Sequence, residues 1–262
     1  MLDEITPVIL TYNEEPNIER SLAGLTWARD VVVVDSGSTD ATLDIARRFP
    51  NVRIVQRGMD SLAAQSNFGL AQARTPWALL LDADYILSPQ FADELRTLTP
   101  PPNVHAYRSA FTYAVNGKPL RASLYPPRIV LLHREHANVW QDGHAHRVLA
   151  EGETADLETR IVHDDRKSFA RFVERQKKYM RQEAEKLRTA DPRTLNLAAR
   201  LRKLIVIAPI AVLFHTLFVK GLILDGVAGL RYTWERFVAE VILARALVER
   251  RPSSAAEKKP HD

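Results

Sequence analysis

The stretch Trp77-Ala78-Leu79-Leu80-Leu81-Asp82-Ala83-Asp84 decides the fold class, because an apolar run of strand-forming length ends in two carboxylates one residue apart. Such a run is typical of a buried strand in a parallel sheet. Two acids at its exit offer the hard oxygen ligands that Mg²⁺ and Mn²⁺ prefer, and such an ion usually acts on phosphate. The stretch therefore indicates a metal-assisted site for a nucleotide diphosphate.

Short apolar runs alternate with helix-like segments through the first hundred residues. We expect strands at residues 6–11, 31–35, 52–55 and 77–81. Asp40 is expected to cap a helix that ends near Phe49, and Ser88 followed by Pro89 suits the start of the next helix. This alternation predicts an α/β fold with a mostly parallel sheet flanked by helices.

The pattern changes after three consecutive prolines at 100–102. Longer strands at 104–115 and 118–121, joined by Asn116-Gly117, predict an antiparallel hairpin that extends the sheet. A charged helix is expected at 168–187, and its predicted buried stripe is Phe169, Phe172, Val173, Tyr179 and Met180. We place a domain boundary near Asp164, which gives a main domain at 1–164, a helical region at 165–252 and a disordered tail at 253–262.

Composition narrows the chemistry of the 262-residue chain. It has no cysteine, so disulfides are excluded and a metal must be held by carboxylate or imidazole. The formal net charge is +4, with the basic excess in residues 164–203. No nucleic-acid-binding signature accompanies that excess, so it favours a membrane surface over nucleic acid. The N-terminus lacks the pattern of a secretory signal, so we expect no export.

Two apolar segments follow the basic stretch. Residues 204–219 contain no charged residue apart from His215, but Pro209 interrupts the run and it is short for a bilayer span. We expect an interfacial or re-entrant helix there. A second helix at 227–250 places four apolar side chains near one face: Trp234, Phe237, Val241 and Val248. A helical hairpin packed on the main domain remains the alternative.

Two further motifs follow the first and second predicted strands. Thr11-Tyr12-Asn13-Glu14 offers Tyr12 for stacking on a base, and Asp35 can accept a hydrogen bond from a base N–H. Ser36-Gly37-Ser38 then makes a turn that lets the backbone approach a ligand. Each motif alone is a weak signal. Their joint position at the carboxyl edge of a parallel sheet, where ligands bind, strengthens the interpretation.

These three motifs, in this order and spacing, resemble the signatures of the family 2 glycosyltransferases, which are inverting nucleotide-sugar enzymes of GT-A fold. The resemblance extends to the subgroup that builds lipopolysaccharide core. It implies that Asp84 binds Mg²⁺ or Mn²⁺ and that Asp82 contacts the ribose or a metal-bound water and belongs to the metal site. It also implies that Tyr12 and Asp35 hold the nucleobase, with Thr11, Glu14, Gln65 and Asn67 completing the nucleotide site.

The acceptor base is expected in the segment Trp140-Gln141-Asp142-Gly143-His144-Ala145-His146-Arg147. An inverting transfer needs a carboxylate or an equivalent group to deprotonate the acceptor hydroxyl. Asp142 is our candidate, because the family often carries its base about sixty residues after the acid pair. His146 is the alternative, as base or as third metal ligand. The lipopolysaccharide subgroup has a His-Glu pair near here, whereas this chain has His146-Arg147.

Two polar groups are left without a derived mechanism. Arg128 either contacts a diphosphate or an anionic acceptor, or forms an ordinary surface salt bridge. The run His163-Asp164-Asp165-Arg166-Lys167 is interpreted as the hinge into the helical region, and no metal is expected there.

The expected function is an inverting glycosyltransferase at the cytoplasmic face of the inner membrane, peripheral or re-entrant. Its donor would be a nucleotide-diphosphate sugar, with uridine favoured by resemblance, and its acceptor lipid-linked or lipopolysaccharide. No nucleic-acid partner is expected. One alternative is a catalytically inert protein that binds a sugar nucleotide or a membrane. The other is a sugar nucleotidyltransferase, although residues 6–15 lack the glycine-rich loop of that class.

Overall fold

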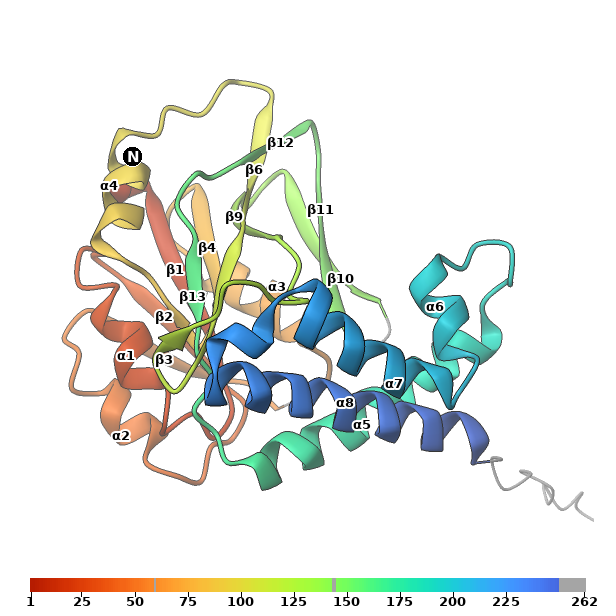
Figure 1. Cartoon of the computed structure of the whole chain (residues 1–262). Helices are drawn as coiled ribbons and strands as arrows, with labels where there is room; N and C mark the ends of the chain where they lie inside the picture. Colours follow the sequence, from red (N-terminus) through yellow and green to blue (C-terminus); the bar gives the residue numbers. More distant parts are fainter. Residues whose placement is uncertain (59, 143–144, 250–262) are drawn as a thin grey trace, which may run out of the picture.

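The computed structural model describes residues 1–58, 60–142 and 145–249, without the side chains of Asp142, Ala145 and His146. The tail expected at 253–262 therefore lies outside the described residues. The chain folds as a mixed α/β structure in which a seven-stranded sheet is flanked by helices (Figure 1). The strand order is β12-β6-β9-β4-β1-β2-β3. Only β9 runs against the other six strands, so the predicted mostly parallel sheet is confirmed.

The first half of the chain supplies the parallel core of this sheet. Its strands are β1 (Ile5–Thr11), β2 (Val31–Asp35), β3 (Val52–Gln56) and β4 (Trp77–Asp82), close to their predicted bounds. The accompanying helices are η1 (Leu2–Glu4), α1 (Ile18–Ala23), α2 (Thr42–Ala46), α3 (Leu62–Gln72) and α4 (Pro89–Thr97). Ser88 caps α4 as predicted. In α2 the N-cap is Ala41, while Asp40 accepts a hydrogen bond from Thr42 N at 3.1 Å.

Alternating side chains of these strands fill two separate cores. Ile9, Val33 and Leu79 face the layer that contains α1 and α4. Val8, Val34 and Leu80 face α3 and Val139 on the other side. Because both faces are covered, the strands are apolar at nearly every position, which is why the sequence reads as continuous apolar runs.

The middle of the chain adds strands in three groups. The large sheet gains β6 (Val104–Ser109), β9 (Arg128–His133) and β12 (Glu153–Asp156). A second sheet contains β5 (Tyr85–Ile86), β7 (Phe111–Val115), β8 (Lys118–Pro119) and β13 (Ile161–His163). A separate ribbon pairs β10 (Ala137–Asp142) with β11 (Ala145–Ala150).

The predicted hairpin is present, but it lies in the second sheet and does not extend the large one, and its first strand is not continuous. Asn116 and Gly117 have φ values of 53° and 82°, as a two-residue turn with right-handed twist requires. The expected strand 104–115, however, is divided between β6 and β7, which belong to different sheets. The single strand is therefore a wrong prediction. The chain changes sheets at Ala110, and strand propensity does not predict such a change.

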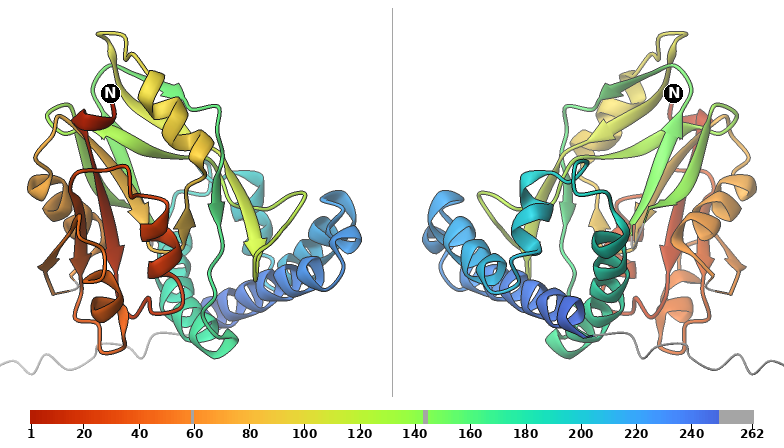
Figure 2. Two further views of the ribbon diagram at one scale, coloured as in Figure 1. Left: turned by 90° about the vertical axis from the view of Figure 1, so that its left-hand side faces the viewer. Right: turned by 90° about the vertical axis from the view of Figure 1, so that its right-hand side faces the viewer.

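The remaining helices form a layer of their own. They are α5 (Phe169–Thr189), α6 (Leu197–Arg202), α7 (Ile207–Phe214), the π-helix η2 (His215–Val219), η3 (Leu222–Asp225) and α8 (Val227–Val248). Helix α8 packs against both α5 and α7. Figure 2 shows α5 and α8 beside the edge at which the parallel strands end. Among the described residues, no helix combines the length and apolar character needed to span a bilayer.

The buried stripe of α5 differs from the predicted one. Phe172 is buried as expected, but Phe169 is 40% exposed. The fully buried positions of the helix are Phe172, Gln176, Ala184 and Leu187. The prediction assumed that the apolar residues face inward, whereas the polar Gln176 is buried and the apolar Phe169 is exposed.

Candidate nucleotide and metal site

The motifs singled out in the sequence meet at the carboxyl edge of the parallel sheet. Thr11 is paired with Asp35 across β1 and β2, and Leu10 is paired with Asp82 across β1 and β4. Tyr12, directly after β1, is 52% exposed, so its ring is available for stacking. The edge where an α/β sheet binds ligands therefore carries the predicted residues of three adjacent strands.

Asp84 lies next to a histidine whose position no local sequence pattern predicts. His163 Nε2 at the end of β13 lies 3.1 Å from Asp84 Oδ2, and both side chains are nearly buried. Burial by itself raises the pKa of Asp84, but His163, Lys167 and Arg175 reverse that effect and hold this pKa well below its usual range. Asp84 is therefore an ionised carboxylate in a dry, positively charged setting.

One oxygen of this carboxylate has no partner among the described residues. Asp84 Oδ1 is buried there and accepts no hydrogen bond from them. An anionic oxygen buried without a donor is costly unless a ligand completes it. Within residues 1–58, 60–142 and 145–249, no three His, Cys, Asp or Glu side chains converge as a complete metal cage. A cation bound by one or two carboxylates plus substrate phosphates needs no such cage, so the unpartnered oxygen of Asp84 fits that kind of site.

The Glu14 side chain faces the helical region and interacts with Lys167, near its start. Its carboxylate forms an ion pair with Lys167 and accepts a hydrogen bond from Asn17 Nδ2 at 2.9 Å. Burial raises the pKa of Glu14 to about 7, although the charge of Lys167 acts in the opposite direction. Asn17 Nδ2 also donates to Asp165 Oδ1 at 3.0 Å. Glu14 therefore joins the first strand's loop to the start of α5.

Asp35 builds the loop that follows β2. Its Oδ2 accepts from the backbone N–H groups of Gly37 and Ser38 at 2.9 and 3.0 Å. Its Oδ1 accepts from the hydroxyls of Thr11, at 3.2 Å, and of Ser38. The side chain is fully buried. Contact between Asp35 and a base would therefore require one of these bonds to open, and Thr11 is committed to the same cluster.

Gln65 and Asn67 each hold a neighbouring segment. Gln65 Nε2 donates to the carbonyl oxygens of Arg57 and Gly58, which follow β3 at the same sheet edge. Asn67 donates to Val139 O at 2.7 Å and accepts from Val139 N at 3.0 Å. These contacts shape the surroundings of the edge, and the predicted contact of either residue with nucleotide remains a prediction.

The β10–β11 ribbon brings the predicted base toward the same edge. Gln141 Oε1 accepts from Ala63 N, in the first turn of α3, at 3.2 Å. Asp142 is the next residue along the backbone and is paired with Ala145, while Gln141 is paired with His146. The side chains of Asp142 and His146 lie outside the described structure, so their roles remain predictions. The structure does describe their backbone positions, on the ribbon next to Gln141, which contacts α3.

A group of aromatic rings surrounds His163. The ring centroids of Tyr113 and Tyr125 lie 4.7 and 4.6 Å from that of His163, and the ring of Tyr85 lies 5.5 Å away. The hydroxyl oxygens of Tyr85 and Tyr125 are 2.6 Å apart. Arg128 stacks over the ring of Tyr125 at 4.9 Å. We call Tyr85, Tyr113 and Tyr125 the tyrosine wall.

Sequence reasoning missed the contribution of residues 163–167. The interpretation of this run as a hinge alone is incomplete, because His163 contacts Asp84, and Asp164 forms ion pairs with Arg20 and Arg166. The only sequence signal for a role of this run was its composition. His163 lies 79 residues after Asp84 and meets it through the short pairing of β13 with β5, which no local pattern reveals.

Comparison with known proteins agrees with this geometry. Residues 6–106 match the family model described as glycosyl transferase family 2. The chain is 30% identical over 84 residues to the lipopolysaccharide core biosynthesis glycosyltransferase LpsC of Rhizobium meliloti (strain 1021), covering 30% of this chain and 31% of LpsC. It is 39% identical over 80 residues to an N-acetylglucosaminyl-diphospho-decaprenol L-rhamnosyltransferase of Mycobacterium tuberculosis, covering 29% and 24% of the two chains. The alignments thus span about a third or less of these relatives.

One solved structure shares the overall fold. The mannosyltransferase PcManGT from Pyrobaculum calidifontis, solved in complex with GDP-Man and Mn²⁺, matches with a TM-score of 0.54 at 20% identity. The match covers 92% of this chain and 86% of that chain. At this identity the likeness establishes the fold alone. The expected GT-A class is therefore confirmed.

Proposed function

Because residues 6–106 form a glycosyl transferase family 2 domain, we propose that this chain transfers a sugar from a nucleotide-diphosphate donor to a lipid-linked or lipopolysaccharide acceptor. The observation that carries the proposal is Asp84. Its carboxylate is buried beside His163, with one oxygen unpartnered, at the sheet edge where nucleotides bind.

The donor site in this proposal uses the residues of the strand ends. Asp84, oriented by His163, would hold Mg²⁺ or Mn²⁺, which neutralises the charge on a departing diphosphate. Asp82 faces the ribose or a metal-bound water, and Tyr12 stacks on the base. Asp35 organises the loop that receives the base. A uridine donor is proposed from the family resemblance, and PcManGT in complex with GDP-Man shows that the fold also accommodates guanosine.

Asp142 is proposed as the base that removes the acceptor proton, with His146 as the alternative. The ribbon tip that carries Asp142 lies beside α3, at the same edge as the donor residues. Inversion follows in this scheme, because the acceptor oxygen attacks on the side opposite the departing diphosphate. Asp142→Asn is then expected to abolish turnover and to leave donor binding intact.

The acceptor class is proposed from the C-terminal helices and from the activities for which LpsC and the rhamnosyltransferase are named. Fourteen of the twenty large hydrophobic side chains that are exposed in the described part of the chain lie between Leu204 and Val248. On α7 and η2 they recur at Ile207, Ile210, Phe214 and Phe218, and on α8 at Val227, Leu230, Trp234, Val241 and Val248. We call these two sets the apolar faces. Each has the spacing of one helix side, as an interfacial helix requires.

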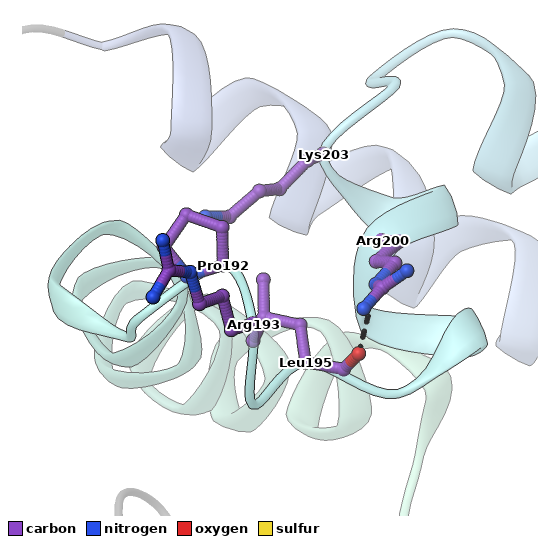
Figure 3. A pocket seen from close by; sticks show the side chains of 5 residues that line it. All are labelled: Pro192, Arg193, Leu195, Arg200 and Lys203. Carbon is purple, nitrogen blue, oxygen red and sulfur yellow. Dashed lines mark hydrogen bonds between the residues drawn. The ribbon is translucent and has the colours of Figure 1, made fainter.

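Basic side chains lie in the segment that directly precedes α7, which carries one of the apolar faces. A shallow pocket between the end of α5 and α6 is lined by Pro192, Arg193, Leu195, Arg200 and Lys203 (Figure 3). Cations beside an apolar surface favour anionic lipid headgroups. We propose that the helical region, beginning near Asp164, rests on the cytoplasmic leaflet of the inner membrane and presents the acceptor to the sheet edge.

Nucleotide binding tests the proposal. Calorimetry with UDP and GDP, with and without Mn²⁺, is expected to show metal-dependent binding of one of them by the wild type. Asp84→Asn should lose the metal dependence. Asp93→Asn, an exposed aspartate on α4, is the matched control and should bind as the wild type.

The rival functions give different results. An inert binding protein would bind the nucleotide but release none from a nucleotide sugar in the presence of acceptor membranes, and Asp142→Asn would change nothing. A nucleotidyltransferase would release pyrophosphate from a nucleoside triphosphate and a sugar phosphate. If neither UDP nor GDP binds the wild type under any condition, the transferase proposal is wrong.

A further inference from the structure

Arg128 is a partly buried cation without a hydrogen-bonding partner. Within the described ranges it forms neither a hydrogen bond nor an ion pair, so the surface salt bridge considered from the sequence is absent. Its one described contact is the ring of Tyr125, 4.9 Å from the guanidinium carbon. A guanidinium carries five N–H donors, and those of Arg128 are not among the buried polar atoms, so they are accessible to a ligand.

The position of Arg128 is fixed by the sheet. It is the first residue of β9, which runs antiparallel to β4 with Leu79 opposite Leu131 and Trp77 opposite His133. Because the two strands are antiparallel, the start of β9 lies toward the end of β4, and on its other side Arg128 is paired with Ser109 of β6. The side chain therefore starts at the strand end that also carries the two candidate nucleotide and metal carboxylates.

The tyrosine wall restricts where the guanidinium can go. The Tyr125 ring beneath it packs against His163 and Phe111, and its hydroxyl lies 2.6 Å from that of Tyr85. Although burial works in the other direction, the neighbouring Tyr125, Tyr85, Asp82 and Asp84 raise the pKa of Arg128. Arg128 is thus held close to the two aspartates while its donors remain unused.

We propose that Arg128 binds a phosphate group at this edge with its unused N–H donors. The inference rests on the proposed transferase function. Planar guanidinium donors match phosphate oxygens in pairs, which is the geometry a stacked arginine is suited to present. Two sources share this chemistry, namely the diphosphate of the donor and a phosphate on the acceptor.

The test uses Arg128→Gln in the full chain. If the donor is the source, the variant binds UDP or GDP, whichever binds the wild type with Mn²⁺, about tenfold or more weakly. Its affinity for the corresponding nucleoside should not change. If the acceptor is the source, nucleotide binding is unchanged, but inorganic phosphate binds the wild type saturated with nucleotide and Mn²⁺ and does not bind the variant.

Two further variants serve as a control and as an alternative test. Arg108→Gln removes a guanidinium from β6, the neighbouring strand, where it forms an exposed ion pair with Asp156, and should behave as the wild type. Arg128→Lys keeps the charge without the planar fork and should show a smaller loss, which serves as the test if Arg128→Gln does not fold.

The inference is overturned if Arg128→Gln equals the wild type in both arms. It is also overturned if nucleoside and nucleoside diphosphate weaken equally, since that result indicates a structural role. A wild type that binds nucleotide while Arg128→Gln changes nothing refutes this inference alone. A wild type that binds no nucleotide refutes the proposed function and this inference together.

Discussion

The aspartates at the sheet edge do different work although they stand in similar motifs. Both carboxylate oxygens of Asp35 accept hydrogen bonds, from hydroxyl and N–H groups of its own loop and from the hydroxyl of Thr11. Asp84 keeps one oxygen unpartnered beside His163. Burial penalises an unsatisfied carboxylate oxygen, so the unsatisfied one marks the position that a ligand completes. At the scale of single residues, Asp84 is therefore the centre of the candidate site.

Glu14 gives a prediction about pH. Its pKa in the folded chain is about 7, above the value of 4.5 expected when it is exposed, so folding favours its protonated form. Its contribution to stability is full below about pH 4.5 and is lost as the pH rises through 7. Chemical denaturation of Glu14→Gln at several pH values should therefore show a shallower loss of unfolding free energy between pH 5 and 8 than the wild type.

Glu15→Gln, at the exposed neighbouring position, is the control for this measurement. It should follow the wild type. A Glu14→Gln profile parallel to that of the wild type would show that Glu14 does not titrate in this range, and that the Lys167 ion pair keeps it ionised.

At the scale of elements, the parallel core was predictable and the additions to it were not. The strands β1, β2 and β4 are buried on both faces, so apolar runs mark them directly, whereas β3 at the sheet edge is only partly buried. The strands β9, β12 and β13 are short or half exposed and take their places through pairings distant in sequence. Local pattern contains no information about such pairings. The same limit hid His163, while the ends of β1, β2 and β4 located the rest of the candidate site.

The packing of α8 on η3 gives a prediction about an element contact. Replacing glycine by alanine inside a helix usually stabilises it. At Gly229, however, a Cβ atom would lie 1.9 Å from the carbonyl oxygen of Leu222. Gly229→Ala should therefore lower the unfolding free energy by about 2 kcal/mol or more, since η3 must move away from the helix. Thermal or chemical denaturation measures the change.

Leu230→Ala on the same helix is the matched control. Leu230 is exposed, so its truncation should leave stability nearly unchanged. A stabilised Gly229→Ala would mean that α8 and η3 are not packed as described.

At the scale of the whole molecule, the helical layer combines two surfaces with opposite properties. Tyr232 of α8 contacts the ring of Tyr113 in the tyrosine wall at 4.8 Å, while Trp234, two residues later, is 53% exposed. One helix thus reaches both the candidate site and an apolar face. Figure 2 shows this helix beside the edge at which the parallel strands end. The arrangement suits a transferase whose acceptor lies in a membrane.

Vesicle binding tests the role of the apolar faces. The wild type should sediment with vesicles that contain phosphatidylglycerol, and less with phosphatidylcholine alone. The double variant Phe214→Ser and Trp234→Ser should lose most of this binding, because each change removes an exposed apolar anchor. Leu149→Ser, on β11 and 61% exposed, is the control and should bind as the wild type. If the double variant binds as well as the wild type, membrane contact belongs to another surface. If the wild type does not bind, the proposed membrane contact is refuted.

The central claim is that Asp84, oriented by His163, holds the cation that receives the donor diphosphate. The most direct measurement is a crystal structure with Mn²⁺ and the nucleoside diphosphate selected by calorimetry. The data are collected at a wavelength at which manganese gives an anomalous signal. The account predicts one strong anomalous peak within about 2.3 Å of the Asp84 carboxylate, in contact with the diphosphate. A peak at any other carboxylate, or a bound diphosphate with no manganese beside Asp84, would contradict it.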